Sequence, residues 1–133
     1  MSDRIETVVL DSQGLSAWFS HDRGTLAMIR SFHSMAADLV VCANTIVEVV
    51  HARVNTPRLN WALSQVRIEP VTEQAARASA KLLIQAGLHG HKHAIDATVA
   101  EVALRQPGPV AVLTSDVDDM VKLCGSRVRV IAV

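Results

Sequence analysis

Short runs of branched apolar residues alternate with helical patterns along this chain. Four runs are almost continuously hydrophobic, and they cover residues 7–10, 39–42, 110–113 and 128–131, with a weaker fifth run at 66–71. A run without strict alternation of apolar and polar positions is typical of a strand that helices cover on both faces. We therefore predict that these segments are buried strands of one sheet.

Helical patterns fill the intervals between the predicted strands. The clearest begins with Thr72 and Glu73, is rich in alanine and leucine, and ends at Gly87. Other helices are expected over residues 12–19, 23–35 and 93–105. Strands that alternate with helices indicate a parallel sheet with right-handed crossovers. The pattern thus predicts the α/β class, as a three-layer α/β/α structure.

The composition agrees with one compact domain over residues 1–133, because half of the residues are hydrophobic and 20% are charged. With two Trp, two Phe and no Tyr, the chain has too few aromatic rings for a base-stacking domain. No stretch resembles a membrane span or a signal peptide, so we expect a cytoplasmic protein without membrane contact. Cys42 and Cys124 lie among apolar residues and are expected to be reduced packing residues.

Four acidic residues stand where predicted strands end or where the following helices begin. Asp11 directly follows the first strand, and Asp116 follows the strand over 110–113. Glu48 lies in an apolar segment after the second strand, and Asp96 lies near the start of the helix over 93–105. Ligands of open parallel sheets bind beyond the carboxyl ends of the strands. We therefore expect these four carboxylates to meet at one end of the sheet.

Each of these acids also has a purely structural explanation. Asp11 and Asp116 could each cap the helix that follows. Glu48 stands three residues after Thr45, the spacing of a capping box, and Asp96 would suit the macrodipole in a first helical turn. Clustering favours a cation instead, because neighbouring carboxylates repel one another. Their hard oxygens select Mg²⁺ or Mn²⁺, and such a site supports metal-assisted hydrolysis of a phosphodiester.

A net charge of zero does not exclude a polyanionic substrate. The 13 Lys and Arg balance 13 Asp and Glu, but if six acids line a site, seven remain against thirteen bases. The six acids are Asp11, Glu48, Asp96, Asp116, Asp118 and Asp119. The candidates for phosphate contacts, none of them assigned, are Arg23, Arg30, Arg53, Arg58 and Lys92. The histidine-rich segment 89–93 follows Gly87 and is expected to be a solvated loop rather than a metal site.

In these positions the chain resembles the PIN-domain ribonucleases, and especially the VapC-type toxins of toxin–antitoxin pairs. The likeness extends over essentially the whole chain and rests on VVLDS at 8–12, TIVEV at 45–49, IDATVA at 95–100 and LTSDVDD at 113–119. It implies a sheet of about five parallel strands in which the first and fourth are neighbours. It also implies an Mg²⁺- or Mn²⁺-dependent endoribonuclease that cleaves RNA, forms a homodimer and is inhibited by a cognate antitoxin.

The same resemblance assigns roles to the acids. The catalytic residues it implies are Asp11, Glu48, Asp96 and Asp116, and the metal ligands are Asp11, Asp96, Asp116 and Asp119. Glu48 would help to orient the metal or the water, while the choice between Asp118 and Asp119 stays open.

The alternative function is a catalytically silent binding or regulatory domain of the same fold, which the four intact acids disfavour. A receiver domain would need a lysine after the last strand. A haloacid-dehalogenase-type phosphatase would need a second aspartate, at position 13. The chain has neither.

Overall fold

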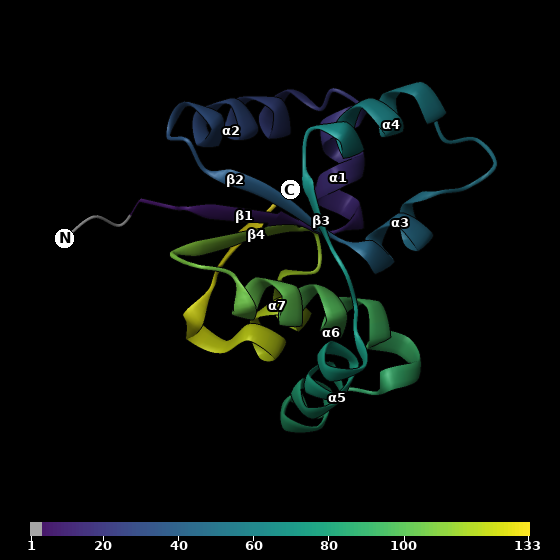
Figure 1. The fold of residues 1–133 in the computed structure, drawn as a ribbon, viewed down its shortest axis with the longest axis vertical. Coiled ribbons are helices and arrows are strands. Elements are labelled where there is room, and N and C mark those ends of the chain that lie inside the picture. The colour runs from purple at the N-terminus through teal and green to yellow at the C-terminus, as the bar shows by residue number, and fades with distance from the viewer. Residues whose placement is uncertain (1–3) are drawn as a thin grey trace.

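Five parallel strands form the central sheet, in the order β3-β2-β1-β4-β5 (Figure 1). The computed structural model describes residues 4–133. The strands of this part of the chain are β1 (Thr7–Leu10), β2 (Asp38–Cys42), β3 (Arg67–Glu69), β4 (Val110–Thr114) and β5 (Arg129–Ala132). The predicted α/β class, the five-stranded parallel sheet and the adjacency of β1 and β4 are confirmed.

The register of the three inner strands brings their carboxyl ends to one level. Leu10 at the end of β1 pairs with Val41 of β2 on one side and with Leu113 of β4 on the other. The residues that follow these strands therefore emerge at one edge of the sheet. We call this the carboxyl edge, and it is where ligand sites of open parallel sheets lie.

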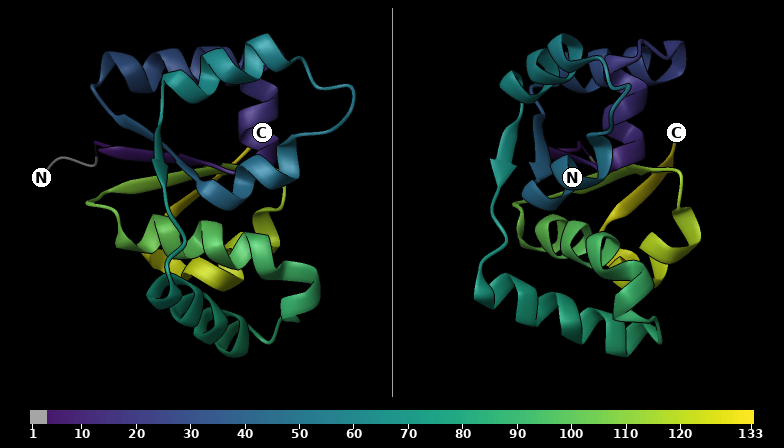
Figure 2. Two further views of the ribbon diagram at one scale, coloured as in Figure 1. Left: turned by 45° about the vertical axis from the view of Figure 1, so that its right-hand side comes forward. Right: turned by 90° about the vertical axis from the view of Figure 1, so that its right-hand side faces the viewer.

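Helices cover both faces of the sheet (Figures 1 and 2). On one face, α1 (Ser12–Phe19), α2 (Arg23–Ser34) and α4 (Thr56–Ser64) share a core with Val8 and Leu10. On the other face, α6 (Gly90–Arg105) and α7 (Val117–Cys124) pack with Val9, and α5 (Glu73–Ala86) packs against α6. Successive strand residues thus enter opposite cores, which explains why β1 is hydrophobic at every position.

The remaining elements and the predicted packing residues complete this picture. The short helix α3 (Ala43–Val49) follows β2 directly, and a 3₁₀ turn (Gly125–Arg127) follows α7. Cys42 and Cys124 are free and buried, so the prediction that they are packing residues is confirmed. Within residues 4–133, no helix is both long enough and apolar enough to cross a membrane.

Local sequence signals explain where the helices begin and end. The Thr72 side chain accepts a hydrogen bond from the Ala75 N–H at the start of α5, and Gly87 ends that helix in the left-handed conformation with φ 68°. Both ends of α5 agree with the sequence prediction.

Two segments differ from the prediction. Helix α4 was not predicted, although Asn55 caps it by accepting from the Arg58 N–H and Pro57 lies in its first turn. The prediction of a solvated loop over residues 89–93 is wrong from Gly90 onward. The His93 N–H donates to the His89 carbonyl, which closes a helical turn that joins α6 through a kink at His93.

The close approach of α1 to β4 provides a test of this packing. A Cβ at Gly14 would lie 2.7 Å from the Leu113 carbonyl oxygen. We expect Gly14→Ala to lower the free energy of unfolding by about 1–3 kcal/mol, because the helix must move off the strand. Urea denaturation measures the change. Gly24→Ala is the control, since a Cβ there lies 3.6 Å from its nearest neighbour and should cost nothing. Equal stability of Gly14→Ala and wild type would contradict the packing.

Candidate metal centre at the carboxyl edge

Asp11 is the buried member of the acidic site. It follows β1 directly, is only 3% exposed, and its N–H donates to the Leu113 carbonyl of β4 at 3.3 Å. Its Oδ1 accepts from the Gly14 N–H at 2.9 Å, which also makes it the N-cap of α1. The capping explanation and the site explanation therefore both hold for Asp11.

Burial dominates the ionisation of Asp11. Desolvation raises the pKa of its carboxyl to about 6, although hydrogen bonds from Thr114 and Gly14 favour the ionised form. The negative charge of Asp96 raises the pKa further. The surroundings of Asp11 thus do not fully compensate the negative charge of its ionised carboxylate.

Asp96 on α6 is the acid that interacts electrostatically with each of the other predicted acids. Burial is the largest effect on the pKa of Asp96 and raises it, while the neighbouring His93 lowers it. The charges of Asp116 and Glu48 both raise it again. Because the charge of Asp96 also raises the pKa of Asp11, each of the other three predicted acids lies within electrostatic reach of Asp96. The kink at His93 divides α6, and Asp96 lies in the first turn after the kink, so its position also suits the macrodipole of that part of the helix.

The capping explanations for Glu48 and Asp116 are wrong. Helix α3 begins at Ala43, so Thr45 lies inside it and cannot be the first residue of a capping box. The exposed Glu48 instead accepts a hydrogen bond from the Ser12 hydroxyl. Asp116 occupies the N-cap position of α7, but its side chain makes no capping hydrogen bond. Both carboxylates are therefore free of the structural role that their positions suggested.

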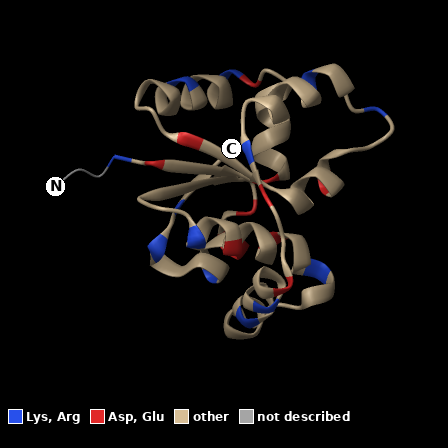
Figure 3. Ribbon diagram, viewed as in Figure 1, with Lys and Arg blue, Asp and Glu red and all other residues tan. Residues whose placement is uncertain are grey.

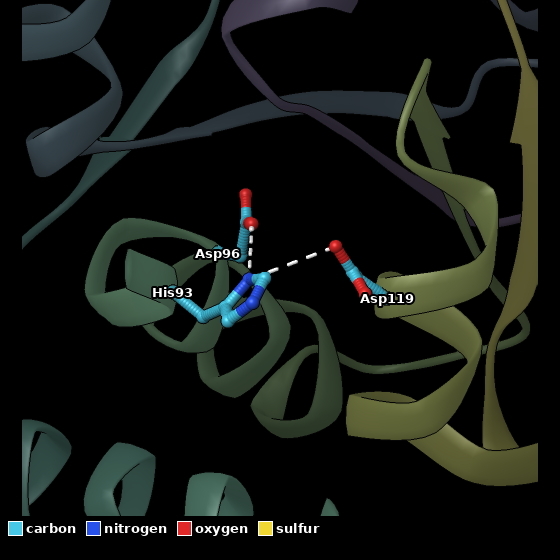
Figure 4. Close-up of side chains that lie close together, drawn as sticks. All are labelled: His93, Asp96 and Asp119. Atoms are coloured by element: carbon cyan, nitrogen blue, oxygen red, sulfur yellow. Dashed lines mark ion pairs between the residues drawn. The ribbon is translucent and has the colours of Figure 1, made fainter. Parts of the chain in front are cut away.

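A histidine joins the acids on the α6 and α7 side of the site. His93 Nδ1 lies 3.5 Å from Asp96 Oδ2 and 3.6 Å from Asp119 Oδ2, so the ring nitrogen faces both carboxylates (Figure 4). Asp119 is partly buried, whereas Asp118 is exposed. The question that the sequence left open is thus answered in favour of Asp119. His93 was missed, although its position three residues before Asp96 places both side chains on one helix face.

This group fits a divalent cation by its donor atoms. One ligand atom from each of His93, Asp96 and Asp119 lies within 4.8 Å of the others. The Nδ1 of His93 is buried and makes no hydrogen bond, and its contacts with the oxygens of Asp96 and Asp119 are ion pairs at 3.5 Å and 3.6 Å. Carboxylate oxygens and imidazole nitrogen are common ligands of divalent metals. Asp11 and Asp116 are not members of this close group, but the charge of Asp96 raises the pKa of Asp11 and that of Asp116 raises the pKa of Asp96.

The fold and the acidic edge define an α/β protein with a candidate divalent metal centre. Neither a protein-family model nor a curated protein matches the sequence. The structure resembles a chain in "Crystal structure of VapBC2 from Rickettsia felis bound to a DNA fragment from their promoter", with a TM-score of 0.73. The match covers 96% of this chain and 98% of that chain, at 13% identity. This chain therefore shares the fold of that chain, a five-stranded parallel sheet between helices, which agrees with the expected PIN-like architecture.

The raised pKa of Asp11 predicts how stability depends on pH in the absence of metal. Above pH 6 the folded protein holds a buried negative charge that Asp11→Asn removes, so the variant should be more stable, by up to about 3 kcal/mol. Because the folded pKa is above the unfolded one, this difference should shrink as the pH falls from 6 towards 4. Urea unfolding in the presence of EDTA at several pH values measures it.

Asp22→Asn is the control for this pH series. Asp22 is the exposed cap of α2, and the backbone and side-chain hydrogen bonds from Thr25 lower its pKa. Its substitution should therefore reduce stability at neutral pH, with the loss fading as the pH falls. Equal stability of wild type and Asp11→Asn at pH 7.5 would contradict the prediction that the buried charge of Asp11 destabilises the folded protein.

Proposed function

We propose that the protein is a metal-dependent endoribonuclease and the toxin of a type II toxin–antitoxin pair. The observation that carries this proposal is that Asp96 lies within electrostatic reach of Asp11, Glu48 and Asp116 and close to Asp119. They come from the end of β1, from α3, from α6 and from the start of α7. The shared fold with a chain of a VapBC2 crystal structure supports the toxin assignment.

The acids divide into two roles in this proposal. Asp11, Asp96, Asp116 and Asp119 hold Mg²⁺, or Mn²⁺ in its place. When bound, the ion supplies an activated water and neutralises the charge that develops on the phosphodiester. Glu48 has its carboxylate fixed by the Ser12 hydroxyl and stays exposed, so it is placed to orient the attacking water. Ser12 is then a positioning residue, since it acts through Glu48.

RNA is the proposed substrate, and the distribution of charge supports it. The Lys and Arg residues are spread over the helices, the loops and the edge strands β3 and β5 (Figure 3). Arg53 lies in the loop that follows α3, and Lys92 lies in the first turn of α6, one residue before His93. Both are exposed and close in sequence to site residues, so they are suited to hold phosphates on either side of the scissile bond.

An antitoxin is the proposed protein partner, and a groove with both apolar and polar walls supports it. The groove has a volume of about 520 Å³, and it is lined by Trp18, Leu26, Ile29 and Trp61 and by the polar residues His21, Arg30, His33 and Gln65. Trp61 is 54% exposed, and its ring centroid lies 5.5 Å from that of the buried Trp18. Exposed aromatic side chains in grooves are typical anchors of protein interfaces. The predicted homodimer belongs to the same proposal.

Cleavage of RNA tests this function. Purified protein free of antitoxin is incubated with total cellular RNA and Mg²⁺ or Mn²⁺, and the fragments are separated on gels. We expect discrete fragments that EDTA abolishes. Asp96→Asn and Asp119→Asn should each lower the rate at least about 100-fold, the equivalent of about 2.7 kcal/mol of transition-state stabilisation.

Asp118→Asn is the matched control for these substitutions. It removes the same charge from the neighbouring position on α7, but Asp118 is exposed and outside the close group, so cleavage should stay within about twofold of wild type. Loss of activity in all three variants would indicate a general charge effect. Folded wild type that leaves RNA intact with either metal would overturn the nuclease function and favour a silent binding domain.

A further inference from the structure

His93 has a buried ring nitrogen without a hydrogen-bond partner. Its side chain is only 12% exposed, and Nδ1 is inaccessible to solvent. A buried polar atom that makes no hydrogen bond costs about 1–3 kcal/mol, so such atoms are rare in folded proteins. The position of this atom between two carboxylates therefore needs an explanation other than packing.

The two distances are close to those between ligands of one ion. Donor atoms that share an ion at about 2.1 Å lie about 3.0–3.4 Å apart, in octahedral or tetrahedral geometry. His93 Nδ1 lies 3.5 Å and 3.6 Å from the oxygens of Asp96 and Asp119, only a few tenths of an ångström more. The separations are also too long for strong charge-assisted hydrogen bonds, which are about 2.7–2.9 Å.

The backbone of α6 is kinked at His93, the residue whose ring faces the two carboxylates. His93 has φ −118° and ψ 18° inside α6, where the first turn meets the longer part of the helix. His93 thereby begins the straight part of α6, three residues before Asp96. Asp119 comes from the first turn of α7. The three donor atoms thus converge from two helices that pack against each other.

We propose that His93 is a direct metal ligand and that its nitrogen gives the site a preference for Mn²⁺ and later first-row metals over Mg²⁺. Mg²⁺ binds almost only to oxygen, whereas imidazole binds Mn²⁺ and more strongly the metals that follow it. A site built only of carboxylates would show a weaker preference of this kind, so the part of the preference that His93 supplies is the part lost in a variant without the imidazole. The inference deepens the proposed function by naming its metal, but its test does not depend on RNA cleavage.

Metal binding without RNA tests the proposal. The full chain, stripped with EDTA and free of any affinity tag, is titrated with MnCl₂ or MgCl₂ by calorimetry. Co²⁺ binding is followed by visible absorption. We expect wild type to bind Mn²⁺ at least about 10-fold more tightly than Mg²⁺. His93→Ala should weaken Mn²⁺ and Co²⁺ binding about 10- to 100-fold and change Mg²⁺ binding less than about threefold.

Two further variants and a spectroscopic measurement complete the experiment. His91→Ala removes an exposed histidine from the first turn of the same helix and should leave all affinities unchanged. His93→Gln keeps the size of the side chain and offers an oxygen, so it should restore Mg²⁺ binding better than Mn²⁺ binding. In Mn²⁺-loaded wild type, electron spin echo modulation should detect a directly bound nitrogen, which provides a test even if both His93 variants unfold.

The outcomes separate this proposal from the nuclease proposal. Equal Mn²⁺ affinity in wild type and folded His93→Ala, or absence of the nitrogen signal, would overturn the ligand role and leave His93 as an ion-pair partner of the acids. Mn²⁺ binding that depends on His93, in a protein that cleaves no RNA, would support the metal site and overturn the nuclease. If His93→Ala changes neither RNA cleavage nor the metal affinities, the result would support the nuclease and overturn the role of His93 as a metal ligand.

Discussion

Uncompensated negative charge at the carboxyl edge of the sheet is the constraint on which the rest of this structure depends. The inner strand β1 is covered on both faces and flanked by β2 and β4, so the residue that follows it has almost no access to water. That residue is Asp11, and the Gly14 N–H and Thr114 hydroxyl compensate its charge only in part, because its pKa is still raised to about 6. The arrangement costs stability in the metal-free state, as is common where a fold prepares a site.

The segment from Asp11 to Gly14 serves the fold and the site together. Asp11 caps α1 through the Gly14 N–H, and the absence of a side chain at Gly14 lets α1 approach the end of β4. Ser12, between them, holds Glu48 of α3. A change in this segment therefore alters the helix start, the packing on β4 and the placement of an acid at once. Stability and site geometry cannot be separated here, which is why the tests above rely on controls elsewhere in the chain.

The sequence predicted those features that depend on local pattern. Continuous apolar runs identified the buried strands, and the positions of Asp11 and Asp116 shortly after two of them predicted that both lie at one edge of the sheet. Thr72 and Gly87 marked the ends of α5 because capping depends on a few neighbouring residues. These features follow from residues that are close together in the sequence.

The missed features depend on tertiary contacts or on ambiguous signals. Asn55 and Pro57 occur both in loops and at helix starts, and α4 buries only Leu59 and Ala62, too few for a clear periodicity. His93 lies near two glycines and two other histidines, a composition typical of a solvated loop, and its role depends on the docking of α7 against α6. The choice between Asp118 and Asp119 required the rotation of α7, which the burial of its apolar residues Met120, Leu123 and Cys124 fixes.

Helix α1 connects the two surfaces that carry the proposed function. Asp11 of the metal centre stands at its beginning, and Trp18 of the groove lies near its end, so an eight-residue helix of about 12 Å separates them. A partner that filled only the groove would leave the acids open to RNA. Inhibition by the proposed antitoxin therefore requires either a second segment that reaches the carboxyl edge or a displacement of α1. A displacement would be costly, because α1 is anchored on Asp11, Glu48 and the end of β4. The rigidity of this helix thus favours an inhibitor that extends along the surface over one that acts at a distance.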